Sequence, residues 1–316
     1  MEFDSRAQPY KWWDDRTTIS DATIAGVRYD EAIFANPKSI YAYFDSKIYG
    51  CDDYKRKMAV AIFNAIHKRI KTNFLIIGES GCGKTELARV LKEAYPNTVI
   101  FDSSNASPKS FKGNNSITDC LLNINDTQPA FVFIDEFDKC LFKGSEIGSM
   151  LESELLKLTE GAQVFVGDDK NRKVFDTALV SFIFMGTFAQ LKKERSMTIG
   201  FNSSTNFVEK ESPISKDDIV DSGIISNEFI GRLNGGIIQL PAMTPDKVKA
   251  MLSDSRYSPV SRLERQYNLT INLTPNRIDE LANLTPKYGV RGIYAELQEK
   301  IGEAMFENSD LQSVTI

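Results

Sequence analysis

Histidine is nearly absent from this sequence, since His67 is the only one among 316 residues. Catalytic and metal sites that need two histidines from one chain are therefore excluded. No apolar run approaches the ~20 residues of a membrane-spanning helix, and the first residues lack the pattern of a signal peptide. These absences predict a cytoplasmic protein. The cysteines include no C-x-x-C pair, which argues against a zinc ribbon; they are Cys51, Cys82, Cys120 and Cys140.

An excess of positive charge is also missing. The 38 Lys and Arg residues face 43 Asp and Glu residues, which leaves a net charge of −5. No global basic field is available to attract nucleic acid. The 42% hydrophobic and 26% charged content is ordinary for a globular protein, and the length suffices for two domains.

The octapeptide at residues 78–85, GESGCGKT, predicts a phosphate-binding loop. It fits the pattern G-x-x-x-x-G-K-[ST], with the apolar run Phe74–Ile77 before it and a helix-like stretch, Glu86–Glu93, after it. Glycines let backbone N–H groups surround a polyphosphate. Lys84 is expected at the β- and γ-phosphates and Thr85 at Mg²⁺. The residues of this segment expected to contact the nucleotide are Gly78, Ser80, Gly81, Cys82, Gly83, Lys84, Thr85 and Glu86.

A second apolar run, Phe131–Ile134, ends in two carboxylates. We expect Asp135 to hold Mg²⁺ beside Thr85, and Glu136 to polarise the attacking water. The alternative is that these carboxylates only solvate a strand end. Thr187 follows a further apolar run and is a candidate to sit between that water and the γ-phosphate, or else a turn threonine. Cys82 is interpreted as a packing residue, or alternatively as a thiol made oxidisable by the helix N-terminus.

Apolar runs alternate with helical patterns, which predicts an α/β fold with a central parallel sheet. The expected strands are Phe74–Ile77, Val99–Asp102, Ala130–Ile134 and Val180–Met185. Residues 244–307 are predicted to be mainly helical. We expect an irregular N-terminal arm at residues 1–35, a large α/β nucleotide-binding domain at 36–242 and a small helical lid domain at 243–316.

In this order of motifs the sequence resembles the AAA+ ATPases, and among them the ClpX-type unfoldases. The resemblance covers residues 36–307. Beyond the phosphate loop and the Asp-Glu strand, it rests on six segments: Asn36–Ile40, Lys47–Gly50, Leu155–Gly161, Phe184–Phe188, Glu228–Leu233 and Gly289–Gly292. The family's P-loop fold, with its small all-α lid, is the expected architecture.

The resemblance implies roles for residues outside the two motifs. Ile48 and Tyr49 would pack on the adenine of ATP. Arg232 corresponds to the arginine finger that reaches the γ-phosphate of a neighbouring subunit, and Arg291 to the sensor-2 arginine that couples the lid to the nucleotide. The alternatives are a solvated charge for Arg232 and a local ion pair for Arg291.

Two loops are assigned through the same resemblance. Phe111 and Lys112 fall at the substrate pore loop, where this chain has Lys112 in place of an apolar residue; Phe111 could instead lie under its own loop. Ile199-Gly200-Phe201 falls where the family carries its peptidase-docking tripeptide. Residues 1–35 contain no cysteine, so they cannot supply the family's N-terminal zinc-binding module.

The resulting expectation is an enzyme, an ATP-dependent protein unfoldase or remodelling motor. It would form a ring, most simply a hexamer, with ATP and Mg²⁺ at subunit interfaces and a ClpP-like peptidase as partner. Three alternatives are a remodelling ATPase without a peptidase, a motor that acts on nucleic acid, and a binding module that hydrolyses ATP slowly.

Overall fold

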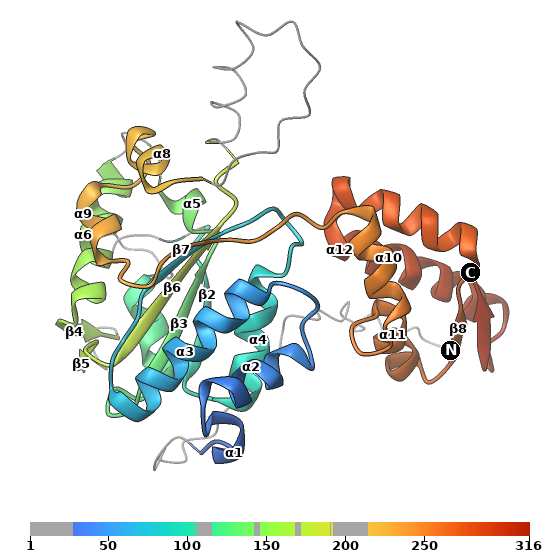
Figure 1. Cartoon of the computed structure of the whole chain (residues 1–316), viewed down its shortest axis with the longest axis horizontal. Coiled ribbons are helices and arrows are strands. Elements are labelled where there is room, and N and C mark those ends of the chain that lie inside the picture. The colour runs from blue at the N-terminus through green and yellow to red at the C-terminus, as the bar shows by residue number, and fades with distance from the viewer. Residues whose placement is uncertain are drawn as a thin grey trace, which may run out of the picture.

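The computed structural model describes residues 28–104, 106, 116–141, 146–167, 172–189, 191 and 214–316, with only the helical backbone for 285–288. Figure 1 shows a larger α/β unit joined by one extended segment to a smaller helical unit. Each unit has its own buried apolar cluster or clusters. None of the helices in these ranges is long and apolar enough to cross a membrane.

The core of the larger unit is a parallel five-stranded sheet in the order β2-β3-β6-β1-β7. In β1 the side chains alternate, so that Leu75 and Ile77 enter one cluster and Phe74 and Ile76 the other. Burial on both faces explains why the strands read as continuous apolar runs. The strands are β1 (Phe74–Ile77), β2 (Thr98–Asp102), β3 (Ala130–Asp135), β6 (Val180–Gly186) and β7 (Gly236–Gln239).

Helices cover both faces of this sheet (Figure 1). One face carries α1 (Glu31–Phe34), α2 (Pro37–Asp45), α3 (Asp52–Lys68) and α4 (Lys84–Ala94). The other carries η1 (Ile117–Asn123), α5 (Phe137–Cys140), α6 (Glu146–Glu160), α8 (Lys216–Asp221) and α9 (Asn227–Arg232). An antiparallel hairpin joins β4 (Gln163–Val166) to β5 (Lys173–Asp176). The predicted α/β fold with a central parallel sheet is confirmed.

Within residues 28–35, the end of the predicted irregular arm, α1 is ordered. The Asp30 side chain caps it by accepting the N–H of Ala32. Phe34 is buried, and its ring lies 5.6 Å from that of Tyr95. These residues therefore belong to the packed α/β unit, and residues 1–27 lie outside the described ranges.

The smaller unit, which we call the lid, begins each helix with Ser or Thr followed by Pro. Thr244, Ser258 and Thr274 each cap a helix through the side-chain oxygen, and the proline that follows is suited to the first helical position. The helices are α10 (Pro245–Ser253), α11 (Pro259–Tyr267) and α12 (Pro275–Glu307). Two short parallel strands, β8 (Thr270–Asn272) and β9 (Ser313–Thr315), are added to the predicted helices.

Candidate active site

The octapeptide forms the loop between β1 and α4. Gly81 and Gly83 have positive φ angles of 77° and 97°, a conformation that glycine adopts without strain. Lys84 begins α4 and is 8% exposed. Its Nζ donates to the carbonyl oxygens of Gly78 at 2.6 Å and Glu79 at 2.8 Å, so its ammonium group lies against the inside of the loop.

Cys82 is a packing residue of this loop. It is 4% exposed, and a Cβ on Gly78 would lie 2.6 Å from its Sγ. Burial raises the pKa of the Cys82 thiol above its ordinary value. This direction favours the packing interpretation over an oxidisable thiol, because desolvation of the thiolate outweighs the attraction of nearby Lys84.

Thr85 and Asp135 meet across the sheet end. Thr85 Oγ1 donates to Asp135 Oδ2 at 2.7 Å, and the other carboxylate oxygen accepts the N–H of Glu136 at 3.0 Å. A hydroxyl beside a carboxylate is a set of hard oxygen donors. It fits Mg²⁺, which keeps water and phosphate oxygens as its remaining ligands.

Glu136 has the left-handed conformation, with φ 58° and ψ 29°. This costs a non-glycine residue about 1–3 kcal/mol and is typical of functional sites. Its side chain remains 37% exposed and forms an ion pair with Lys139 in the next helical turn. The carboxylate of Glu136 is thus partly exposed, with Oε2 buried against Lys139.

Thr187 follows β6, the strand next to β1. The carbonyl oxygen of Gly186 accepts the N–H of Gly78 at 3.2 Å, so Thr187 lies near the start of the phosphate loop. Asp138 Oδ2 accepts both the Thr187 hydroxyl at 2.8 Å and the Phe188 N–H at 2.9 Å. The sequence prediction missed this role of Asp138, whose position three residues after Asp135 was the available signal.

The lid contacts the phosphate loop through Gly289. A Cβ on Gly289 would lie 2.9 Å from the carbonyl oxygen of Ser80, and one on Gly81 would lie 2.8 Å from Cα of Gly289. Gly289 has φ 63° and ψ −173° and interrupts α12. The exposed Arg291 lies two residues beyond this contact, at the start of the second part of the helix.

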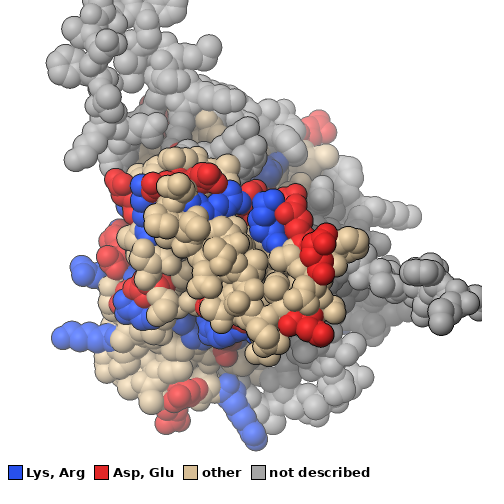
Figure 2. Space-filling view, turned by 90° about the vertical axis from the view of Figure 1, so that its right-hand side faces the viewer, with Lys and Arg blue, Asp and Glu red and all other residues tan. Residues whose placement is uncertain are grey.

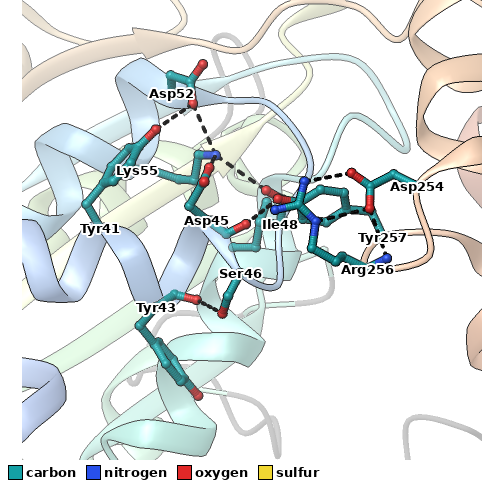
Figure 3. Close-up of polar contacts among 10 residues, drawn as sticks. All are labelled: Tyr41, Tyr43, Asp45, Ser46, Ile48, Asp52, Lys55, Asp254, Arg256 and Tyr257. Atoms are coloured by element: carbon teal, nitrogen blue, oxygen red, sulfur yellow. Dashed lines mark hydrogen bonds and ion pairs between the residues drawn. The ribbon is translucent and has the colours of Figure 1, made fainter.

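The Ile48-Tyr49 segment contacts both the α/β unit and the lid. Ile48 is buried in the sheet-side cluster, whereas the Tyr49 ring meets the ring of Tyr257 in the lid, with 5.5 Å between centroids. The Tyr257 hydroxyl also donates to the carbonyl oxygen of Asp45 (Figure 3). A pocket of ≈ 350 Å³ opens here, lined among others by Tyr49, Cys51, Lys55, Met243, Lys247 and Tyr257.

The buried side chain of Lys55 bonds to this segment. It is 1% exposed, and its Nζ contacts carboxylates of Asp45 at 2.5 Å and Asp52 at 3.1 Å, and the Ile48 carbonyl at 3.4 Å (Figure 3). Burial lowers the pKa of Lys55, but hydrogen bonds to the two carboxylates reverse this, so that the pKa is raised. A lysine on the apolar face of α3 was the signal that the sequence prediction missed.

Arg232 lies apart from the phosphate-loop and carboxylate residues described above. It ends α9, where its guanidinium pairs with Glu160 and, at 3.5 Å, with Glu228. Its carbonyl accepts the side-chain N–H of Asn73 at 3.2 Å. Asn73 directly precedes β1, and the phosphate loop follows the other end of that strand, about 13 Å away. Arg232 therefore lies at the opposite end of the sheet from its own phosphate loop.

The predicted loop residues fall outside the described ranges. These are Phe111 and Lys112 of the pore loop and Ile199, Gly200 and Phe201 of the docking loop.

Comparison with known proteins agrees with this geometry. Residues 74–193 match the ATPase family associated with various cellular activities (AAA). An ATP-dependent Clp protease ATP-binding subunit ClpX 2 from Wolinella succinogenes is 28% identical, with 88% of this chain and 79% of the relative covered. ClpX subunits from Treponema denticola and Bacteroides fragilis are 26% and 27% identical, with 86% of this chain and 77% and 76% of the relatives covered.

The chain contains an AAA ATPase domain and is similar to ClpX subunits over most of its length. The matched segment runs from β1 through the phosphate loop and the Asp135-Glu136 strand to the residues after β6. This domain supports ATP binding and ATPase activity. In this AAA+ ATPase the nucleotide elements lie at the carboxyl ends of parallel strands, the usual ligand position in open α/β sheets.

Proposed function

We propose that this AAA+ ATPase is a ring-forming motor that hydrolyses ATP at subunit interfaces in order to unfold or remodel proteins. The observation that carries the proposal is the position of Arg232. Its carbonyl is bonded to Asn73 at the amino end of β1, whereas the phosphate loop follows the carboxyl end. A finger arginine in this place cannot reach its own nucleotide and requires a second subunit.

Hydrolysis is assigned to the residues gathered at the carboxyl end of the sheet. Lys84 would exchange its bonds to the Gly78 and Glu79 carbonyls for phosphate oxygens, and Thr85 and Asp135 would hold Mg²⁺, which would supply positive charge against the phosphates. Glu136 accepts a proton from the attacking water, with Thr187 beside that water. The assignment is supported by the bonds of Lys84 and Thr85 and by the partial exposure of the Glu136 side chain.

The lid completes the nucleotide site in this proposal. Ile48 and Tyr49 pack on the adenine and Arg291 reaches the phosphates. Support comes from the Gly289 contact with Ser80 and Gly81 and from the pocket beside Tyr49. We also propose a large domain that includes residues 28–35 and runs to residue 242, and a lid at 243–316, a division supported by the separate apolar cluster of the lid.

Ring closure needs two different surfaces that meet head to tail. In Figure 1 the lid lies on one side of the sheet and α9, which carries Arg232, on the other. Arg232 of one subunit would approach the nucleotide of the next, where a permanent positive charge stabilises the transition state. A hexamer is the expected ring.

A protein substrate and a peptidase partner are proposed through the relatives, which are named as ATP-binding subunits of Clp protease. Phe111 and Lys112 would grip an extended polypeptide in the channel, and Ile199-Gly200-Phe201 would dock a ClpP-like peptidase in the cytoplasm. A motor without a peptidase is the first alternative. Replacement of Phe201 by Ala separates the two, because only a peptidase-coupled motor loses protein degradation.

A nucleic-acid motor is the second alternative, and charge argues against it. The net charge is −5, and on the lid face in Figure 2 acidic and basic side chains are interspersed. The test is ATPase stimulation by casein, an unfolded protein, and by duplex DNA at moderate ionic strength. The proposal predicts that casein raises the rate and DNA does not. Salt-sensitive stimulation by DNA alone would contradict it.

A further inference from the structure

The buried side chain of Asn73 connects three elements at the amino end of the sheet. Asn73 is 2% exposed and directly precedes β1. Its Nδ2 donates to the carbonyl oxygens of Thr159 at 3.3 Å and Arg232 at 3.2 Å. Its Oδ1 accepts the N–H of Phe182 in β6 at 3.0 Å. Only a side chain with two donors and an acceptor satisfies all three partners.

The backbone of Asn73 is bonded to the turn that follows Arg232. Its N–H donates to Asn234 Oδ1 at 2.7 Å, and its carbonyl accepts the N–H of Gly235 at 2.9 Å. Asn234 Nδ2 in turn donates to the carbonyl of Lys71 at 3.1 Å. The residue directly before β1 is thus bonded to the end of α9 and to the turn that follows it.

These bonds hold the backbone from which the Arg232 side chain projects. Thr159 and Arg232 supply last-turn carbonyls of α6 and α9, which a helix leaves without internal partners. The Asn73 amide joins these two ends, and the side chains of Glu160 and Arg232 form their ion pair beside it. The start of the strand that carries the phosphate loop is therefore fixed to the backbone of Arg232.

We infer that Asn73 is a positioning residue for Arg232, which acts on the nucleotide of the neighbouring subunit rather than on its own. The inference rests on the proposed function, since it requires that Arg232 work across an interface. Loss of the amide releases the end of α9 and misplaces the guanidinium. A displacement of about 1 Å in a reacting group lowers a rate by up to about a hundredfold.

Asn97 offers a matched control. It directly precedes β2, is 4% exposed, and its Nδ2 donates to the carbonyls of Asn125 at 3.0 Å and Pro129 at 2.9 Å. Replacing either residue with Ser removes an amide that bridges buried carbonyls, but only Asn73 is bonded to Arg232. We expect N73S to lower the ATPase rate per subunit of assembled rings at least about tenfold. N97S should leave the rate within about threefold of wild type.

Rings that mix two variants distinguish an effect of Asn73 on the neighbouring subunit's nucleotide site from an effect on its own site. Each mixture is co-expressed with two affinity tags, so that every purified ring contains both kinds of subunit. An R232A subunit keeps an intact nucleotide site but has no arginine finger. An E136Q subunit keeps Arg232 but cannot hydrolyse its own ATP. R232A mixed with E136Q should recover activity, as should N73S mixed with E136Q. N73S mixed with R232A should stay inactive, because neither subunit supplies a finger.

The outcomes distinguish the inference from the function on which it rests. Recovery in the N73S and R232A mixture, as expected for a residue that acts on its own loop, would overturn the positioning role alone. No recovery with R232A and E136Q would overturn the interfacial site, and the inference with it. If N73S does not fold, as judged by binding of a fluorescent ADP analogue, N234A replaces it in the same mixtures.

Discussion

Gly81 of the phosphate loop and Gly289 of the lid lie backbone against backbone. A Cβ on Gly81 would be 2.8 Å from Cα of Gly289, and one on Gly289 would be 3.0 Å from Cα of Gly81. Gly81 belongs to the large unit and Gly289 to the lid. This contact makes the position of the lid and the shape of the phosphate loop depend on each other.

The first prediction concerns Gly289→Ala. The methyl group meets the Ser80 carbonyl, and alanine is strained at a φ of 63°. Strain of about 1–3 kcal/mol is expected, so ATP affinity should fall about tenfold or more. Titration with a fluorescent ATP analogue measures this. Gly302→Ala is the control, since a Cβ there meets nothing within 4 Å. Equal affinity in both variants would contradict the proposed coupling.

Asp138→Asn tests the support of Thr187. Asparagine offers the Thr187 hydroxyl and the Phe188 N–H one carbonyl oxygen, with an amide group in place of the buried second carboxylate oxygen. Because a charged acceptor is lost, unfolding free energy should fall by about 1–3 kcal/mol. The ATPase rate should fall while ATP affinity stays close to that of wild type. Urea unfolding and steady-state kinetics give both quantities, and an unchanged rate would refute a role for this pair in hydrolysis.

Tyr257→Phe tests the contact between the lid and Asp45. The variant loses only the hydroxyl that donates to the Asp45 carbonyl (Figure 3), a bond worth about 1 kcal/mol. ATP affinity should therefore fall about fivefold. Tyr267→Phe, also in the lid, is the matched control and should bind ATP as wild type does. A loss of equal size in both variants would show that the hydroxyl contact has no specific effect.

Both the stability of the fold and the alkylation rate of its thiols should depend on pH. Burial raises the pKa of Cys51 and Cys140 to about 11 and of Cys120 to about 12, and Cys82 is raised as well. The unfolded value is about 8.5. The thiols therefore favour the folded state fully below that pH, and this stabilisation is lost as pH rises toward 11.

At pH 8, iodoacetamide should alkylate the native protein about a hundredfold more slowly than the urea-unfolded protein. The native rate should rise about tenfold per pH unit up to pH 10. Mass spectrometry assigns the modified residues. Reaction of Cys82 at the unfolded rate at pH 8 would restore the redox interpretation of the phosphate loop.

Much of the nucleotide site could be predicted because its residues are neighbours in sequence. GESGCGKT and the apolar run that ends in Asp135-Glu136 each need only a strand and a turn. The predicted strand at Phe74–Ile77 has the observed bounds. By contrast, α3 ends at Lys68 because Arg69 adopts a left-handed conformation with φ 56°. A single positive φ at a non-glycine residue has no clear signal in sequence.

The remaining features depend on contacts between distant segments. β7 was missed because it is a short edge strand that starts at a glycine with φ 79°. Asn73 and Lys55 read as ordinary polar residues, since their partners come from other elements. The Gly289 motif was visible, but its contact with Gly81 requires the lid to fold back on the loop. Each of these is a long-range pairing that no local pattern encodes.

The most direct test of the interfacial site is the ATPase rate per subunit as a function of protein concentration, for wild type and Arg232→Ala. The account predicts that the wild-type rate rises with concentration to a plateau as rings form. Arg232→Ala should bind ATP normally and hydrolyse it at least about a thousandfold more slowly. A rate that is independent of concentration at high dilution, and unchanged by Arg232→Ala, would contradict the account.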